Sequence, residues 1–255
     1  MQFGSNQIKR CKYGWMLFSG PYIGKCFELY GQYSEAEVRV FRAFLRPGDT
    51  AIDVGANIGD LTVPLAGCVG EAGRVYAFES HSDTFNVLCA NLALNQIHTV
   101  RPINAFVSAS DTVDPTGGAW GKYGYVSPQW QPPFVAIDHL ELPGCAFLKV
   151  DVDGNELDVI QSAAATIARF RPVLYLENDA REKSPALLDH LLRSDYAVYF
   201  HPAPIFEPDN FFGNPVNHWA PQDVVSLMML GVPKEREGSA SIGLRKVADK
   251  DDWWR

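Results

Sequence analysis

The residues best suited to chemistry lie at positions 50–60, in the sequence TAIDVGANIGD. Residues 51–54 form a short segment that is mostly apolar and contains β-branched side chains, a composition typical of a buried strand. Gly55 and Gly59 bracket the turn that follows, and the apolar run at 61–69 predicts a helix. A strand, a tight turn and a helix N-terminus together direct backbone N–H groups and a positive dipole end toward a ligand.

The composition of this turn distinguishes between two nucleotide-containing ligands. A dinucleotide site has the pattern Gly-x-Gly-x-x-Gly, which lets the pyrophosphate approach the backbone. Here Ala56 and Asn57 stand between Gly55 and Gly59, so that pattern is broken. Asp53 would repel a pyrophosphate but suits the ammonium and sulfonium groups of S-adenosylmethionine. The turn favours S-adenosylmethionine, with an NAD(P)-dependent oxidoreductase and a non-catalytic module of the same fold as alternatives.

Polar side chains also mark the ends of the other predicted strands. In open α/β sheets a ligand binds outside the carboxyl ends of the strands, where Glu79, Asn104, Asp151, Glu177 and Asn178 are expected. Glu79 is placed to accept hydrogen bonds from the hydroxyls of an adenosine ribose, although it would also serve as a turn cap. We therefore add Glu79 and Asn104 to the expected cofactor-binding residues.

An acid-rich segment follows the fourth predicted strand and contains Asp151, Asp153 and Glu156. Carboxylates this close together require solvent, a cation or altered pKa values. Asp151 is a candidate general base for a substrate hydroxyl. Asp151, Glu177 and Asn178 are also an all-oxygen set that would suit Mg²⁺. Spacing alone does not separate the two roles.

Glu37 has an explanation that needs no ligand. Ser34 and Glu37 match a capping box at the start of a helix predicted to end near Leu45. A cofactor-binding role for Glu37 is the alternative.

The remaining pattern indicates one α/β domain. Strands and helices alternate from residue 50 to residue 200, which predicts a doubly wound, mostly parallel sheet. Residues 1–33 are aromatic and are expected to form an N-terminal extension on the core, or on the core of a second copy in a homo-oligomer. Residues 34–245 would form the domain, and 246–255 a frayed tail. Residues 111–133, rich in glycine and aromatic side chains, suggest a hairpin or binding loop, and 202–217 a pocket wall.

Composition excludes several classes of function. The net charge of −8 over 255 residues disfavours binding to a nucleic-acid backbone. No apolar run reaches the length of a transmembrane segment, and the N-terminus has no signal-peptide layout. The five scattered cysteines have no metal-ligand spacing, so reduced thiols and a cytoplasmic location are expected.

With these residues identified, the chain resembles the FkbM family of S-adenosylmethionine-dependent methyltransferases. Six segments carry the resemblance: YGQYSEAE (30–37), PGDTAIDVGANIG (47–59), GRVYAFE (73–79), NLALN (91–95), LKVDVDGNE (148–156) and RPVLYLEN (171–178). The resemblance implies a class I, Rossmann-like fold. It also implies direct transfer of a methyl group to a hydroxyl of a sugar, lipid or secondary metabolite.

The same resemblance implies roles for individual residues. Asp53, Gly55, Ala56, Asn57 and Gly59 would cradle the methionine part of the donor, and Glu79 would hold its ribose. Asp151, Asp153 and Glu156 would face the transferred methyl group, and Tyr33 and Glu37 match a segment that precedes the glycine turn. Asp153 stands where the family more often has Glu. The possible metal set is similar to that of catechol-type O-methyltransferases, with a Glu replacing an Asp.

Overall fold

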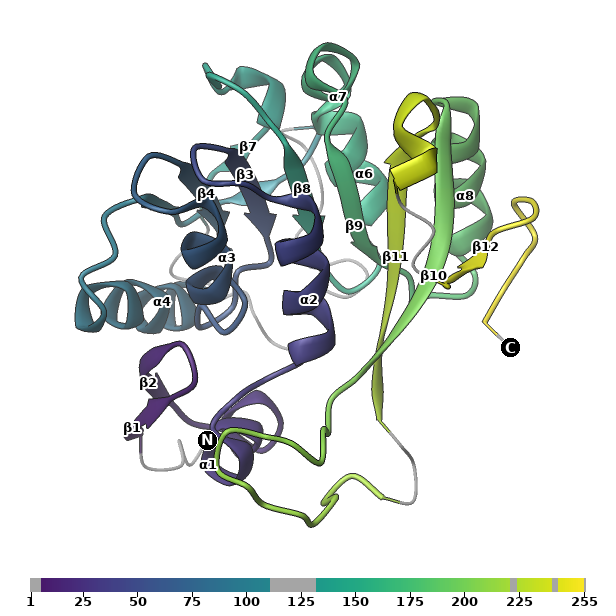
Figure 1. The fold of residues 1–255 in the computed structure, drawn as a ribbon. Coiled ribbons are helices and arrows are strands. Elements are labelled where there is room, and N and C mark those ends of the chain that lie inside the picture. The colour runs from purple at the N-terminus through teal and green to yellow at the C-terminus, as the bar shows by residue number, and fades with distance from the viewer. Residues whose placement is uncertain (1–5, 111–131, 221–223, 240–242, 255) are drawn as a thin grey trace.

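The computed structural model describes residues 6–110, 132–220, 224–239 and 243–254 (Figure 1). Its centre is an eight-stranded sheet with the order β12-β10-β11-β9-β8-β3-β4-β5. The strands are β3 (Thr50–Val54), β4 (Arg74–Phe78), β5 (Val100–Ile103), β8 (Phe147–Val150), β9 (Val173–Glu177), β10 (Tyr196–Pro204), β11 (Val225–Pro233) and β12 (Arg245–Lys246). The five strands from β5 to β9 in this order run parallel, whereas β11 is antiparallel to both neighbours. The predicted α/β class with a mostly parallel sheet is confirmed.

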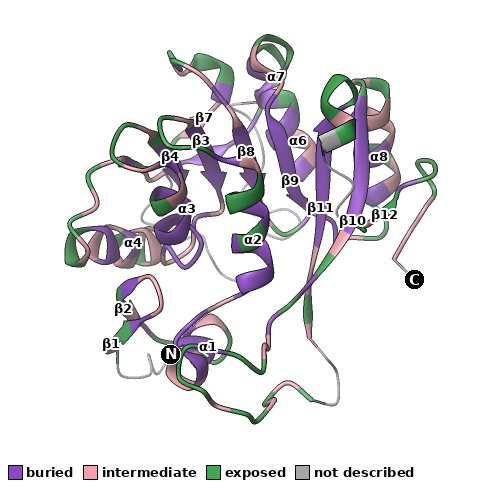
Figure 2. Ribbon diagram, in the orientation of Figure 1, coloured by how far each residue is buried: buried purple, intermediate pink, exposed green. Residues whose placement is uncertain are grey.

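Helices cover both faces of the sheet, which explains why its central strands are apolar on both sides. One core contains side chains from α2 (Glu35–Phe44), α3 (Thr62–Val69) and α4 (Ser82–Leu94). The opposite core contains side chains from α6 (Glu156–Ser162), α7 (Ala164–Phe170) and α8 (Ser184–Arg193). Figure 2 shows the buried residues concentrated on the central strands and on the inward faces of these helices. Between β8 and β9 the chain turns at Ala163 and therefore forms two short helices, α6 and α7.

Alternation along β3 sets the direction in which Asp53 points. Ala51 belongs to the core beneath α2 and α3, and Ile52 to the opposite core. Successive side chains of a strand point to opposite faces, so Asp53 lies on the same face as Ala51. The same register pairs Asp53 with Lys149 on β8. An acid and a base are therefore neighbours inside the sheet.

The N-terminal segment forms a hairpin and a helix that pack against the same chain. The hairpin is β1 (Gln7–Cys11) and β2 (Gly14–Phe18), and the helix is α1 (Ile23–Tyr30). Asn91 on α4 binds the backbone of Leu17 through both its side-chain oxygen (2.6 Å) and nitrogen (3.0 Å). Residues 205–219 lie along α1, where the Phe206 ring packs at a tilt against the Tyr30 ring, with 5.4 Å between the ring centroids. The stretch 202–217 therefore covers the N-terminal segment, and none of its residues lines the main cavity described below.

The last described residues also pack on the domain. Trp254 contacts the Phe200 ring at 4.5 Å and donates a hydrogen bond to the Asn178 carbonyl at 2.7 Å. The expectation of a frayed tail was therefore wrong for these residues, because an indole ring finds both apolar and polar partners here. Short elements complete the fold: β6 (Phe106–Val107) beside β7 (Phe134–Val135), and 3₁₀ turns at Ile137–His139 and Lys234–Ser239. Most of the glycine- and aromatic-rich stretch at 111–133 lies outside the described residues.

Candidate functional site

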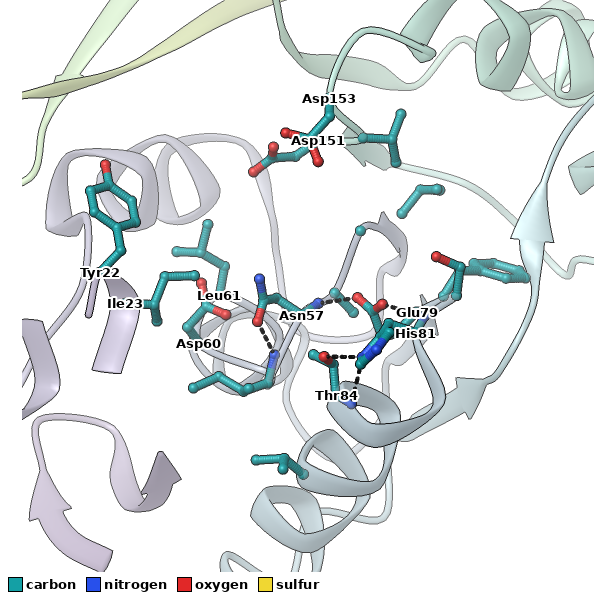
Figure 3. Close-up of a pocket in the computed structure, with 18 of the residues that line it drawn as sticks. Tyr22, Ile23, Asn57, Asp60, Leu61, Glu79, His81, Thr84, Asp151 and Asp153 are labelled. Carbon is teal, nitrogen blue, oxygen red and sulfur yellow. Dashed lines mark hydrogen bonds between the residues drawn. The ribbon is translucent and has the colours of Figure 1, made fainter. Parts of the chain in front are cut away.

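A cavity of about 1100 Å³ lies at the carboxyl ends of β3, β4, β8 and β9, and residues 19–23 close one side of it (Figure 3). Binding pockets for single small ligands measure ~300–1,000 Å³. The space is therefore sufficient for a nucleotide-sized donor together with part of an acceptor.

The glycine turn forms the floor of this cavity. Gly55 has φ of 82°, and a Cβ there would lie 1.9 Å from the Asp151 carbonyl oxygen. Any larger residue would push the β3 and β8 ends apart. The Gly55 and Ala56 N–H groups donate to the Phe78 carbonyl at 3.0 and 2.9 Å, and Asn57 adopts φ of 49°. The turn thus lies tightly across the sheet edge, with its upper surface open to a ligand.

Glu79 is held at the end of β4 by two backbone donors. Its Oε2 accepts from the Asn57 N–H at 2.9 Å, and its Oε1 from the His81 N–H at 2.7 Å. Burial raises the pKa of Glu79 to about 7, although these two hydrogen bonds favour the ionised form. Each carboxylate oxygen keeps lone-pair capacity and the residue lines the cavity, as ribose recognition requires. The Asn104 side chain donates to the Glu79 and Ser80 carbonyls at 2.7 and 3.1 Å. Asn104 therefore stabilises the backbone after β4, and it does not line the cavity.

Asp53 lies below the cavity, where it forms an ion pair with Lys149. Asp53 is fully buried, accepts a hydrogen bond from the Thr62 hydroxyl at 2.7 Å, and has its Oδ1 3.2 Å from Lys149 Nζ. The same ammonium group lies 3.5 Å from Asp151 Oδ2. Burial opposes the charge on Lys149, but Asp53 and Asp151 hold its pKa above the ordinary value. Lys149 lines the cavity and Asp53 does not, so Lys149 links Asp53 to the site.

The capping box predicted for Ser34 and Glu37 is not formed. Ser34 has φ of 39°, and its hydroxyl donates to Glu37 Oε1 at 2.7 Å instead of accepting from the helix backbone. Glu37 is 1% exposed, and burial raises its pKa to about 7 against the opposing influence of Lys149. Helix capping therefore does not explain Glu37, which belongs to the buried charges around Lys149 but does not line the cavity.

The acid-rich segment divides into two groups. Asp151 and Asp153 line the cavity, and the Asp151 side chain is 34% exposed. Glu156 is buried outside it and accepts from the Val152 and Gly154 N–H groups at 3.2 and 3.0 Å. Burial raises the pKa of Glu156 to about 7. Through these two hydrogen bonds Glu156 stabilises the loop that carries Asp151 and Asp153.

Of the three residues proposed for Mg²⁺, only Asp151 and Glu177 line the cavity. Glu177 lines the cavity, and burial followed by the charge of Asp151 raises its pKa well above the ordinary value. Asn178 is buried and does not line the cavity, and its side-chain nitrogen donates to the Ser184 hydroxyl at 3.0 Å. Over the described ranges, no group of three or more His, Cys, Asp or Glu residues is arranged to hold a metal ion. Asp151, Glu177 and Asn178 therefore do not form the Mg²⁺ site that the sequence suggested.

Two residues of the site were missed by sequence reasoning. Asp60 is buried against the cavity, and Lys149 is a buried charge in the middle of an apolar strand. A lysine inside such a strand was a usable signal, because a fully buried lysine is rare unless it is paired. Asp60 gave no such signal, because its neighbours Cys26 and Tyr33 belong to the N-terminal segment, which is distant in sequence.

The sheet order, with acids at the carboxyl ends of its parallel strands, is that of the class I S-adenosylmethionine-dependent methyltransferase fold. The sequence profile of the family described as Methyltransferase FkbM domain matches residues 53–198. The chain belongs to this family.

Solved structures share the fold. Precorrin-6y C5,15-methyltransferase from Geobacter metallireducens superposes with a TM-score of 0.50 at 13% identity, covering 77% of this chain and 87% of that one. Methyltransferase FkbM from Methylobacillus flagellatus also gives 0.50, at 18% identity, covering 77% and 50%.

Two curated relatives match in sequence over shorter stretches. The 23S rRNA (uracil(1939)-C(5))-methyltransferase RlmD from Acinetobacter baylyi is 30% identical over 89 residues, which are 35% of this chain and 18% of the relative. The catalytic subunit TRM61 of tRNA (adenine(58)-N(1))-methyltransferase from Yarrowia lipolytica is 29% identical over 106 residues, 40% of this chain and 26% of the relative. The chain thus spans only about a fifth to a quarter of these relatives.

Proposed function

We propose that this methyltransferase transfers the methyl group of S-adenosylmethionine to a hydroxyl of a small sugar, lipid or secondary metabolite in the cytoplasm. The observation that carries the proposal is Asp151, a partly exposed carboxylate in the cavity whose Oδ2 lies 3.5 Å from Lys149 Nζ. A carboxylate oriented by a buried cation can accept the proton of an acceptor hydroxyl.

The other residues of the cavity supply binding and orientation. S-adenosylmethionine supplies a methyl group already activated on its sulfonium, so alignment with the acceptor oxygen is the main requirement. Glu79 would hold the ribose through its two hydroxyls, and the turn from Gly55 to Gly59 would hold the chain beyond it. Asp151 would then accept the acceptor's proton as the carbon–oxygen bond forms and the carbon–sulfur bond breaks.

The charge of the cavity supports a neutral or cationic acceptor. Among the described lining residues, seven are carboxylic acids, Lys149 is the single lysine, and none is arginine; the acids are Asp60, Glu79, Asp83, Asp151, Asp153, Glu177 and Asp179. Burial keeps Asp60, Glu79 and Glu177 partly protonated at neutral pH, but with Lys149 as the single lysine among these residues the lining still disfavours phosphate groups. This argues for a small hydroxylated molecule even though the two curated relatives are named for methylation of rRNA and tRNA. In the described ranges, moreover, no helix is long and apolar enough to cross a membrane.

Isotope transfer from labelled S-adenosylmethionine to a panel of neutral sugars, glycolipids, polyketide alcohols and tRNA tests the proposal. We expect label in a hydroxylated small molecule. Asp151→Asn should lower turnover ~100-fold or more while S-adenosylhomocysteine binding changes little. Asp83→Asn removes an equal charge elsewhere in the cavity and is the matched control.

Three results would contradict parts of the proposal. Full turnover by Asp151→Asn would remove its role as base. Label found only in tRNA would overturn the acceptor class. Donor binding without transfer to any class of acceptor would favour a non-catalytic module, and nicotinamide binding would restore the oxidoreductase alternative.

A further inference from the structure

Asp60 is a buried acid that faces the cavity without a complete set of partners. It follows Gly59 at the start of α3, is 7% exposed and lines the cavity. Its Oδ1 atom is buried and has no hydrogen-bond partner. Buried polar atoms in folded proteins are nearly always hydrogen-bonded, and exceptions indicate an absent ligand or water. Asp60 also forms no ion pair with any described residue, whereas Lys149 is engaged by Asp53 and Asp151.

The position of Asp60 relative to Glu79 indicates which ligand group it faces. Figure 3 shows the two acids on opposite sides of Asn57, with Asp60 on the side of Tyr22 and Ile23 and Glu79 on the side of His81. In S-adenosylmethionine the amino-acid chain extends from the 5′ end of the ribose through the sulfonium. A donor whose ribose is held by Glu79 therefore extends its amino-acid end across the glycine turn toward Asp60.

We propose that Asp60 binds the α-ammonium group of S-adenosylmethionine directly and selects ligands that carry an amino-acid end. This assignment rests on the donor and not on the acceptor proposed above. It replaces Asp53, expected from the sequence to contact the methionine part, because Asp53 is fully buried beneath Lys149 and does not line the cavity.

The surrounding charges make this carboxyl sensitive to a cationic ligand. Burial raises the pKa of Asp60 to about 8, with Lys149 opposing and Asp53 adding to the increase. The titratable groups around it are Lys149, Asp53, Asp151, Tyr33 and Cys26. Without ligand the carboxyl is therefore mostly protonated at neutral pH. An ammonium group stabilises the ionised form, so affinity for a ligand that carries it should increase as pH rises to about 8.

Calorimetric titration with three ligands tests the assignment. S-adenosylhomocysteine has the ammonium group, its deaminated analogue keeps only the carboxylate, and 5′-methylthioadenosine lacks both. We expect Asp60→Asn to weaken S-adenosylhomocysteine binding ~10- to 100-fold, the range of a charge-assisted hydrogen bond. Binding of the other two ligands should change less than ~3-fold, because neither carries the cation.

Two control variants separate this effect from general damage to the cavity. Glu79→Gln should weaken the binding of all three ligands to a similar extent, since all three contain the ribose. Asp83→Asn removes one negative charge from the lining and should leave the ratio of the three affinities unchanged. Circular dichroism establishes that each variant is folded, and Asp60→Ser replaces Asp60→Asn if the amide destabilises the chain.

The outcomes are distinct. A wild-type preference for S-adenosylhomocysteine that grows with pH and is lost in Asp60→Asn supports the assignment. Equal weakening of all three ligands by Asp60→Asn, or no weakening of any, overturns it while leaving the donor site intact. Failure of the wild-type protein to bind any of the three overturns the donor site itself.

Discussion

Replacing Lys149 by methionine is expected to destabilise the protein strongly. The substitution preserves much of the side-chain volume but leaves Asp53 fully buried without its counterion, since Lys149 Nζ lies 3.2 Å from Asp53 Oδ1. Removing one partner of a buried ion pair costs ~3–5 kcal/mol. Asp151 contributes little to this figure, because its side chain is 34% exposed and solvent screens the charge.

This free-energy loss corresponds to a readily measured shift in melting temperature. In chains of this size, 1 kcal/mol lowers the melting temperature by ~2–4 °C, so Lys149→Met should melt ~6–20 °C below the wild type. The additional substitution Asp53→Asn removes the unpaired charge and keeps an acceptor for the Thr62 hydroxyl. We expect the double variant to recover ~2 kcal/mol or more relative to Lys149→Met alone.

Urea unfolding followed by circular dichroism measures these free energies, and an unchanged slope shows that the comparison is valid. Lys234→Met, in an exposed pair with Asp195, is the control and should have little effect. The reasoning would be refuted if Lys149→Met were nearly as stable as the wild type. It would also be refuted if the double variant were no more stable than Lys149→Met.

Three further predictions concern the turn, the N-terminal segment and pH. Gly55→Ala should abolish donor binding in calorimetry, because its Cβ would overlap the Asp151 carbonyl; unchanged affinity would contradict the tight turn. Asn91→Ala should speed hydrogen exchange in β2, because the side chain binds both backbone groups of Leu17; unchanged protection would show that other contacts hold the hairpin. Burial raises the pKa of three Glu carboxyls to about 7 and of the Asp60 carboxyl to about 8, so the folded chain retains protons that the unfolded chain releases above the ordinary pKa values of 4.5 for Glu and 3.8 for Asp. The free energy of unfolding without ligand should therefore fall between pH ~4.5 and ~8 in urea titrations, and a rise over this window would contradict the burial of Glu37, Asp60, Glu79 and Glu156.

Local signals in the sequence were sufficient for most of the parallel sheet. The alternation of strands and helices from residue 50 onward and the glycine turn follow from periodicity, composition and chain direction, and the structure confirms them. Strand β11 was not predicted, although residues 225–233 are mostly apolar. Its position between β9 and β10 depends on pairing with strands distant in sequence, which periodicity does not reveal.

The residues of the site also fall into those that local sequence signals predicted and those that depend on contacts between distant parts of the chain. Acids at the ends of several parallel strands could be predicted from residue order, because chain direction places those ends along one edge. Which of these acids face the cavity depends on tertiary contacts. Register between β3 and β8 gives Asp53 a buried lysine, and backbone N–H groups of its own loop hold the Glu156 carboxylate. The N-terminal segment brings Cys26 and Tyr33 close to Asp60. These distinctions depend on contacts between distant parts of the chain, and such contacts set the burial and the pKa of each carboxyl group.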